Sequence, residues 1–183
     1  MRRFFLFSLS LLSLSLAFRT DETRLLQGQP AAGMLIGDGK TDVTAALREQ
    51  LQKNGTVHLT RGTYRITSTL EIALDTHDRA SLTGDGTATL LMDGAGPAVR
   101  LIGTHEGTAA PKTVKANIWD KQRTPTISGL EIIGNHAEAD AIEATGTMQL
   151  SIDRVVIRDC RHGIHLVKRN RNVLISNCHI YNN

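Results

Sequence analysis

Aromatic residues are scarce in this chain. Phe, Trp and Tyr make up 4% of its 183 residues, whereas Ile, Leu, Val, Thr and Gly are plentiful. This composition argues against a compact sandwich built on aromatic anchors and favours a core of stacked aliphatic side chains. The length corresponds to one domain at most, with enough chain to bury a sizeable core.

A large net charge is also lacking. The sequence has 21 Lys and Arg against 18 Asp and Glu, which gives a formal net charge of +3. Arg2 and Arg3 lie in a segment that we expect to be removed, so 19 basic residues would remain. A charge so close to zero gives no reason to expect nucleic acid or an anionic membrane as a partner.

The N-terminal apolar run is too short to span a bilayer. It extends from Phe4 to Leu16, about 13 residues against the ~20 that a membrane-spanning helix needs. Arg2 and Arg3 precede it, and Ser15 and Ala17 are small residues at the positions that a signal peptidase reads. We therefore predict a signal peptide at 1–17, a flexible lead-in at 18–34, and a secreted or periplasmic protein. An uncleaved membrane anchor is the alternative.

Cysteines are few, and we expect no disulfide. Cys160 and Cys178 are the only two. An exported protein could join them, but they occupy different positions of the repeat described next. Cys178 replaces larger aliphatic residues in that repeat, so we expect it to behave as a small buried hydrophobe.

One pattern occurs three times between Pro125 and Asn183. Each copy has Ile, two residues, an apolar residue, one residue, Ile, two residues and then a small residue. The aligned positions are Ile127/Ile152/Ile175, Leu130/Val155/Cys178, Ile132/Ile157/Ile180 and Asn135/Cys160/Asn183. The copies are 25 and 23 residues apart. A β-branched repeat of this length, without a helical period, predicts a solenoid of strands.

A second family of strands fits the same coils. Its members align at Val99/Ile142/Ile164 and at Leu101/Ala144/Leu166. Ile142 and Ile164 are 22 residues apart, which is one coil, whereas Val99 and Ile142 are 43 apart. The excess lies in Thr104–Pro125, a loop without repeat character. Such loops on regular scaffolds tend to be functional or disordered.

The N-terminal part predicts a cap for the solenoid. Gly37 and Gly39 indicate a turn, and Thr41 or Asp42 could cap a helix over Val43–Leu51. That helix has one apolar edge, and we expect it to cover the open end of the first coil. Alternating apolar residues then predict strands around Val57, Tyr64 and Ser81–Met92.

This arrangement resembles a known family. The turn Gly37–Asp42, the helix Val43–Leu51 and the segment Gly55–Tyr64 are similar to the N-terminal signature of the pectate-lyase-like superfamily, although Thr60 and Arg61 stand where that family commonly has proline. Asn172–Asn183 independently resembles its parallel β-helix repeat. The resemblance covers roughly 35–183 and implies an all-β, right-handed parallel β-helix with a short N-terminal capping α-helix. It implies less about function, because the superfamily includes lyases, hydrolases, epimerases, phage depolymerases and stalks.

The C-terminal end of the pattern is open. The chain stops at Asn183, at the end of a repeat block and without a cap. We therefore expect the β-helix domain at 35–183 to be incomplete at its C-terminus, or to need an oligomeric partner there.

Outward-facing residues of the second strand family form the candidate site. If its apolar anchors point inward, Arg100, Glu143 and His165 point outward, and Asp140 aligns with His162 in the preceding turns. Carboxylates and imidazoles can do acid–base work, and arginine can hold the carboxylate of an anionic sugar. A groove formed by these residues under the loop would distinguish an enzyme from a non-catalytic module. The site hypothesis fails if Glu143 and His165 point to opposite sides of the solenoid. The alternative is that these residues are polar only because they face water. We predict catalytic roles for Asp140, Glu143, His162 and His165, and substrate binding by Arg100 and Trp119.

No cofactor motif is evident. The turns at 37–39 and 84–86 lack the Gly-Lys-Ser/Thr of a phosphate-binding loop. We predict no metal-ligand set, although the candidate site could bind a divalent cation such as calcium. In the resembling family, lyases typically hold calcium with aspartates and hydrolases use paired aspartates, and this chain has neither cluster. The basic run Lys168–Arg171 fits a solvated turn, with a grip on acidic polysaccharide as the alternative.

These observations predict an exported β-helix protein that acts on or binds polysaccharide, as a lyase or hydrolase if it is an enzyme. Nucleic acid is not expected as a partner, nor is the membrane once the signal peptide has been cleaved. A non-catalytic adhesion or surface module, and an inactive truncated fragment, are the alternatives.

Overall fold

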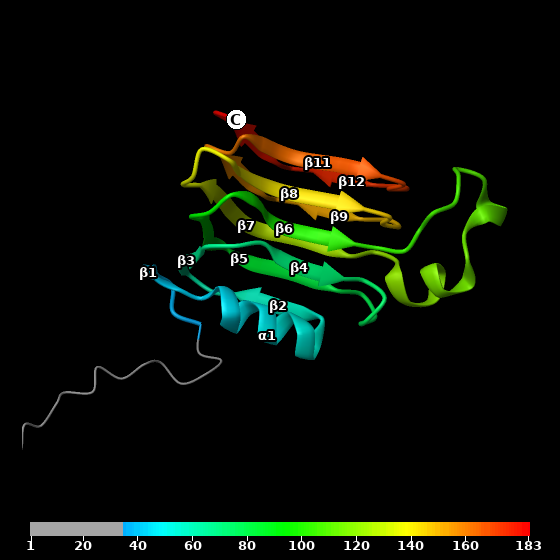
Figure 1. Cartoon of the computed structure of the whole chain (residues 1–183), viewed down its shortest axis with the longest axis horizontal. Coiled ribbons are helices and arrows are strands. Elements are labelled where there is room, and N and C mark those ends of the chain that lie inside the picture. The colour runs from blue at the N-terminus through cyan, green and yellow to red at the C-terminus, as the bar shows by residue number, and fades with distance from the viewer. Residues whose placement is uncertain (1–34) are drawn as a thin grey trace, which may run out of the picture.

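The structure, a computed structural model, describes residues 35–183. The predicted signal peptide at 1–17 and lead-in at 18–34 lie outside the described residues. The described part is mostly β, with parallel sheets that do not close into a barrel (Figure 1). No helix within it is long and apolar enough to cross a membrane.

Nine of the strands described in residues 35–183 form one parallel sheet, here called sheet A. Its main path runs β1-β3-β5-β7-β10-β13, with β2 paired to β5, and β9 paired to β7 and β12. The strands are β1 (Asp38–Asp42), β2 (Thr56–Leu59), β3 (Gly62–Ile66), β5 (Ser81–Met92), β7 (Thr126–Gly134), β9 (Ser151–Asp153), β10 (Val156–Arg158), β12 (Leu174–Ser176) and β13 (His179–Tyr181).

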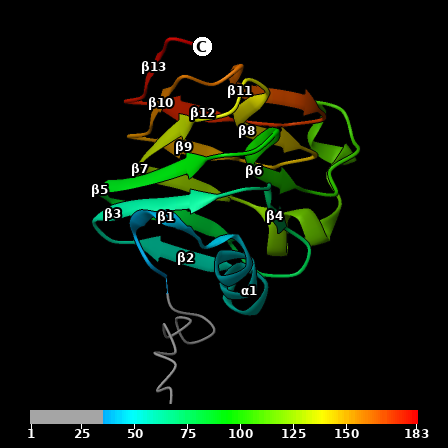
Figure 2. The same cartoon turned by 60° about the vertical axis from the view of Figure 1, so that its left-hand side comes forward.

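Four further strands of the described chain form a second parallel sheet, sheet B. Its order is β11-β8-β6-β4. The strands are β4 (Leu70–Ala73), β6 (Gly96–Ile102), β8 (Ala139–Thr145) and β11 (His162–Lys168). From β3 onward the chain passes back and forth between the two sheets, and each return adds a strand, or in sheet A the strand pairs β9–β10 and β12–β13, beside the earlier ones (Figures 1 and 2). Parallel strands need such crossovers, because a tight hairpin can join only antiparallel neighbours.

The predicted repeats are register partners in the sheets. Ile152 pairs with both Ile127 and Ile175, and Ile157 pairs with both Ile132 and Ile180. In sheet B, Ile142 pairs with both Val99 and Ile164. Inward residues of the earlier strands in both sheets belong to one buried core, whereas Leu166, Ile175 and Ile180 of the last coil are exposed. The repeat alignment is therefore confirmed strand by strand.

Register partners on successive strands form columns of apolar side chains. These columns continue further toward the N-terminus than the sequence pattern indicated. Leu82 precedes Ile127 in its column, and Leu90 precedes Ile132. In sheet B, Leu70 of the short strand β4 pairs with Val99. The strand β4 was not among those predicted, although Leu70 and Ile72 carry its apolar alternation.

The predicted cap helix is present as α1 (Thr44–Asn54). Its residues Leu47 and Leu51 are buried in the common core, together with Val43 just before it. Asp42 Oδ1 accepts a hydrogen bond from Thr44 N at 2.9 Å, which satisfies one donor of the first turn. Gly55 ends the helix with a left-handed φ of 68°.

Two glycine turns differ from the prediction. The turn expected at Gly37–Gly39 is an irregular strand, β1, whose pairing with β3 shifts register. The turn at 84–86 lies within the long strand β5, where the register also shifts. Gly84 is required there by close approach: a Cβ on it would lie 2.5 Å from Gly129 O of the neighbouring strand.

The segment between β6 and β7, residues 103–125, has no strand in the described structure. It contains a 3₁₀ turn, η1 (Pro111–Thr113), and a short helix, η2 (Ile118–Gln122). Gln122 closes its base, because its amide accepts from Thr104 N at 2.8 Å and donates to Thr104 Oγ1 at 2.7 Å. The segment extends beyond the C-terminal ends of the sheet B strands (Figure 1).

Candidate functional site

Asp140 and His162 begin the neighbouring strands β8 and β11 and are register partners. Asp140 is buried, at 6% exposed, and its carboxylate accepts three hydrogen bonds. Arg161 donates two of them, from Nε at 3.0 Å and from Nη2 at 2.7 Å, and His162 Nδ1 lies 2.8 Å from Oδ1. The hydrogen bonds from Arg161, and then that from His162, hold the pKa of Asp140 below its usual value against the opposing effect of burial.

This environment fixes the tautomer of His162. Asp140 is ionised at neutral pH, so its oxygens can only accept hydrogen bonds. His162 must therefore carry a proton on Nδ1 to make the 2.8 Å contact. The neutral ring then has its lone pair on Nε2, and the His162 side chain is 55% exposed. A carboxylate that orients an imidazole in this way prepares the ring for proton transfer at Nε2.

A row of charged residues crosses the outward face of sheet B beside this pair. Glu71, Arg100, Glu143 and His165 are successive register partners on β4, β6, β8 and β11. Arg100 Nε donates to Glu143 Oε1 at 2.6 Å, and Arg100 Nη1 donates to Glu71 Oε1 at 2.9 Å. The predicted neighbours Glu143 and His165 are therefore register partners, and Arg100 belongs to the same row.

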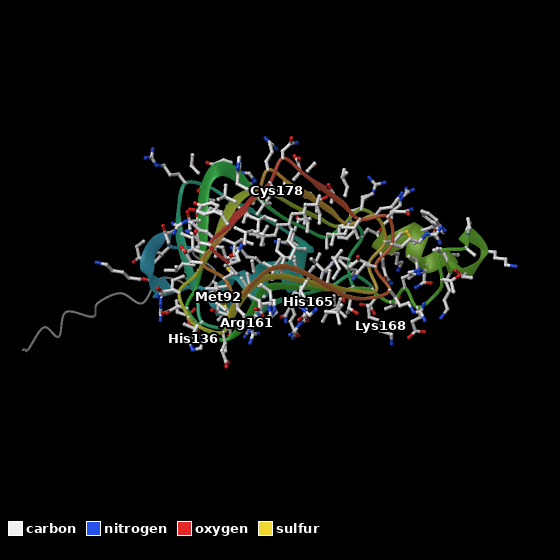
Figure 3. All side chains as sticks on the ribbon, turned by 90° about the horizontal axis from the view of Figure 1, so that it is seen from above. Met92, His136, Arg161, His165, Lys168 and Cys178 are labelled. Atoms are coloured by element: carbon white, nitrogen blue, oxygen red, sulfur yellow. The ribbon has the colours of Figure 1, made fainter. Side chains whose placement is uncertain are left out.

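The two histidines join the pair to the row. The ring centroids of His162 and His165 lie 5.7 Å apart. In Figure 3, the labelled Arg161, His165 and Lys168 follow one side of the molecule, away from Cys178, which lies between β12 and β13. The four predicted catalytic residues, together with Arg100, thus form a continuous polar strip. It combines an oriented imidazole, a second imidazole and a carboxylate, which are groups that suit acid–base chemistry.

The loop does not cover this strip, so the groove beneath the loop that would favour an enzyme is not formed by the described residues. Residues 103–125 lie beyond the far ends of the strands, whereas Asp140 and His162 stand at the starts of β8 and β11 (Figure 1). Trp119 is part of η2 in that segment and is partly exposed. The structure therefore separates Trp119 from Asp140 and His162. At the other end of the row, Arg100 and Glu71 line a cavity of about 470 Å³ beside α1.

No group of three or more His, Cys, Asp or Glu side chains within residues 35–183 is placed to hold a metal ion. The carboxylates of the strip are instead engaged by arginine: Asp140 by Arg161, and Glu71 and Glu143 by Arg100. Cys160 is buried and Cys178 is partly buried, and both are free thiols.

Sequence reasoning missed two members of the strip. Arg161 makes a bidentate contact with Asp140. Its position directly before His162, at the start of a predicted strand, could have indicated it. Glu71 could have been found from Leu70 and Ile72, which repeat the alternation of Val99 and Leu101.

Comparison of the chain with protein-family models, with curated proteins and with solved structures gives no significant match.

Proposed function

We propose that the chain is a right-handed parallel β-helix of the type found in the pectate-lyase-like superfamily, exported to the periplasm or the cell exterior by its N-terminal segment. The alternation between two parallel sheets and the apolar columns of one residue per strand support this proposal. The buried cap helix α1 at one end of the core agrees with it.

We infer that the protein acts on or binds polysaccharide along the outward strip of sheet B. The observation that carries this inference is the Asp140–His162 pair beside the row of Glu71, Arg100, Glu143 and His165. Neighbouring strands place these side chains at intervals of ~4.8 Å. A straight and open row of polar groups suits an extended polymer of hydroxyl-rich units better than a small compact ligand.

If the protein is an enzyme, His162 is the acid–base group. Its Nε2 accepts a proton from the substrate or from water and returns it to the leaving oxygen, while Asp140 holds the ring in position. Glu143 on the neighbouring strand supplies a second carboxylate, and His165, three residues along the same strand, supplies a second imidazole. These roles fit a glycoside hydrolase or a polysaccharide lyase.

The test is a screen of the full chain against neutral and acidic polysaccharides. Hydrolysis is measured by the appearance of reducing ends, and lyase activity by the ultraviolet absorbance of unsaturated products. We expect activity on at least one glycan, and an about 100-fold or greater loss in His162→Gln, in line with the 10²–10⁴-fold contribution of a general acid–base. His179→Gln is the matched control, since His179 is exposed on β13 of the other sheet. Equal activity in the two variants would refute the role of His162.

A non-catalytic binding module is the second candidate. Two observations favour it: Arg100 is engaged by two carboxylates, and His162 and His165 are exposed. In that case a glycan array should give binding that Glu143→Gln or His165→Gln weakens, without any product of cleavage. The absence of both binding and cleavage on every glycan would exclude both candidates.

A further inference from the structure

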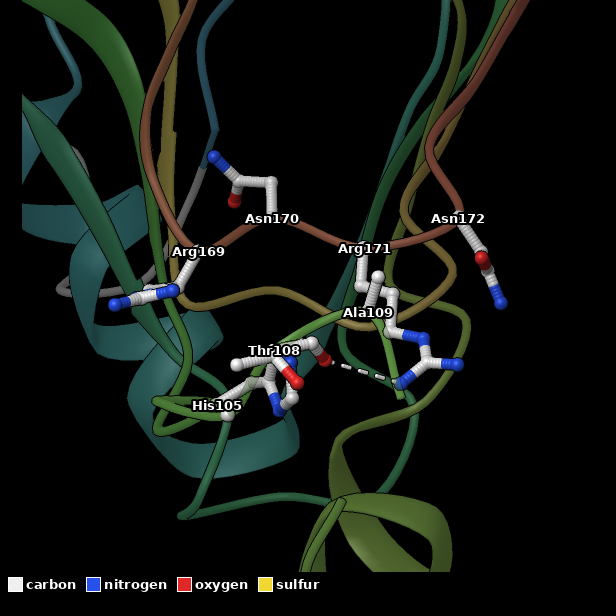
Figure 4. A pocket seen from close by; sticks show the side chains of 8 residues that line it. His105, Thr108, Ala109, Arg169, Asn170, Arg171 and Asn172 are labelled. Carbon is white, nitrogen blue, oxygen red and sulfur yellow. Dashed lines mark hydrogen bonds between the residues drawn. The ribbon is translucent and has the colours of Figure 1, made fainter. Parts of the chain in front are cut away.

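A second polar site lies at the other end of sheet B. Residues 105–109 of the loop and 169–172 of the turn after β11 enclose a cavity of about 430 Å³ (Figure 4). These two segments are some sixty residues apart in the chain. Arg171 connects them, because its Nη1 donates to Thr108 O at 3.3 Å and to Ala110 O at 3.2 Å.

The charged groups lining this cavity are basic. They are Arg169 and Arg171; the imidazole of His105 lies beside them, and no Asp or Glu side chain lines the cavity. Lys168 and Glu106 line a smaller cavity of about 200 Å³ that shares His105 and Arg169 with the first. Together the two cavities are lined by three basic side chains, those of Lys168, Arg169 and Arg171, and by one exposed carboxylate, that of Glu106.

Arg169 differs from the other arginines of sheet B. Within residues 35–183 its exposed side chain makes no hydrogen bond or ion pair, whereas Arg100 and Arg161 are both engaged by carboxylates. In Figure 4, Arg169 and Arg171 stand on either side of His105 and Thr108. His105 is 3% exposed at the floor. Burial lowers its pKa, and Arg171 and Arg169 lower it further, which reflects the positive surroundings.

We propose that this cavity binds an oxyanion, either a free sulfate or phosphate ion or the same group carried on a saccharide, with Arg169 and Arg171 as its ligands. A guanidinium presents a planar fork of donors that matches two oxygens of such a group. The cavity volume exceeds that of one ion, so it also leaves room for the unit that carries the anion. This site is separate from the strip of sheet B and goes beyond the proposed function.

The full chain is titrated by calorimetry with inorganic sulfate, with a sulfated oligosaccharide and with the unsulfated form of that oligosaccharide. Each titration is run at low and at high sodium chloride concentration. We expect sulfate to bind at low salt and to weaken as chloride screens the site. In Arg169→Gln, affinity should fall about ten-fold or more, the effect of losing one charge-assisted hydrogen bond. The imidazole resonance of His105, identified by its loss in His105→Gln, should shift on binding.

Arg154→Gln is the matched control. Arg154 also has a left-handed backbone, with φ 52° against 57° for Arg169, and its side chain is 69% exposed. Both variants remove one charge at a turn, but Arg154 lies outside the cavity and is paired with Asp153 at 3.1 Å. Tighter binding of the sulfated saccharide than of free sulfate identifies the saccharide-borne group, and binding of free sulfate alone identifies the ion; either result supports the site. Equal affinity in Arg169→Gln and Arg154→Gln, or no sulfate binding at low salt, overturns it. His162→Gln should leave sulfate binding unchanged, so this test is independent of the glycan screen.

Discussion

Arg100 and Glu143 lie opposite each other on β6 and β8, with Arg100 Nε donating to Glu143 Oε1 at 2.6 Å. The same guanidinium reaches Glu71 on its other side. A residue suggested by the sequence as a receptor for a sugar carboxylate is thus already held by two carboxylates of its own chain. An anionic ligand would have to displace one of them, and this is a physical reason to look for the anion site at Arg169 instead.

A double-mutant cycle of Arg100→Gln and Glu143→Gln measures this pair. The side chains are 33% and 22% exposed, so solvent screens the contact and we expect a coupling of about 0.2–1 kcal/mol in the free energy of unfolding. Urea denaturation of the four proteins at low salt gives the value, and 1 M sodium chloride should reduce it. A coupling of zero at low salt would mean that the contact contributes nothing in solution.

Asp140→Asn should destabilise the fold more strongly. The substitution replaces a buried carboxylate that binds Arg161 and His162 with a neutral amide. The expected loss in the free energy of unfolding is about 1–3 kcal/mol at pH 7. Because the pKa of Asp140 is lowered on folding, its contribution is present above the unfolded pKa of 3.8 and is lost as pH falls through the folded value. The difference between wild type and Asp140→Asn in urea should therefore shrink below pH 3.8. The exposed Asp120→Asn is the control, and an equal cost in both variants would contradict the prediction.

His105 should make the free energy of unfolding depend on pH in a higher range than Asp140 does. Its pKa is lowered in the folded protein, so on acidification the unfolded chain takes up this proton first. Stability is then complete above the unfolded pKa of 6.5 and falls as pH drops below it, by at most about 1.4 kcal/mol per pH unit. Urea midpoints measured between pH 7.5 and pH 5.5 should show this slope in wild type, and His105→Gln should reduce it. His136→Gln, on an exposed turn, should retain it; a slope unchanged in His105→Gln would assign the effect to other groups.

The sequence predicted the strand registers well but not the side-chain partners. Ile127, Ile152 and Ile175 repeat one residue type at one spacing, and alternation along a strand leaves only one way to stack them inward. The partners of Arg100 depend on Glu71, whose strand is four residues long. The cavity at Arg169 depends on where the unpatterned loop 103–125 lies relative to a turn sixty residues later. The alternation of Leu70 and Ile72 is a short local signal for the first relationship, whereas the second leaves no local pattern in the chain.

Ile132→Ala and Ile133→Ala test the inward–outward alternation with adjacent residues of the same type. Ile132 is fully buried in a column with Leu90 and Ile157, whereas Ile133 is partly exposed. Removal of buried methyl groups leaves a cavity, so Ile132→Ala should cost about 2–5 kcal/mol of unfolding free energy. Ile133→Ala should cost clearly less, since its side chain already contacts water. Comparable costs in urea denaturation would place the core on both faces of β7 and contradict the register.

The thiol of Cys160 is buried in the core, with the residue 3% exposed. Burial raises its pKa to about 11. At pH 8 only about one thiol in a thousand is then the reactive thiolate, and the surrounding side chains exclude the reagent. In Cys178→Ser, which leaves Cys160 as the sole thiol, we expect maleimide labelling to be slow in buffer and fast in concentrated urea, as followed by intact-mass spectrometry. Cys160→Ser provides the comparison, because Cys178 is partly exposed and should label faster in buffer. Rapid labelling of Cys160 in buffer would show that the end of sheet A around it opens readily, and that the buried core stops short of this residue in solution.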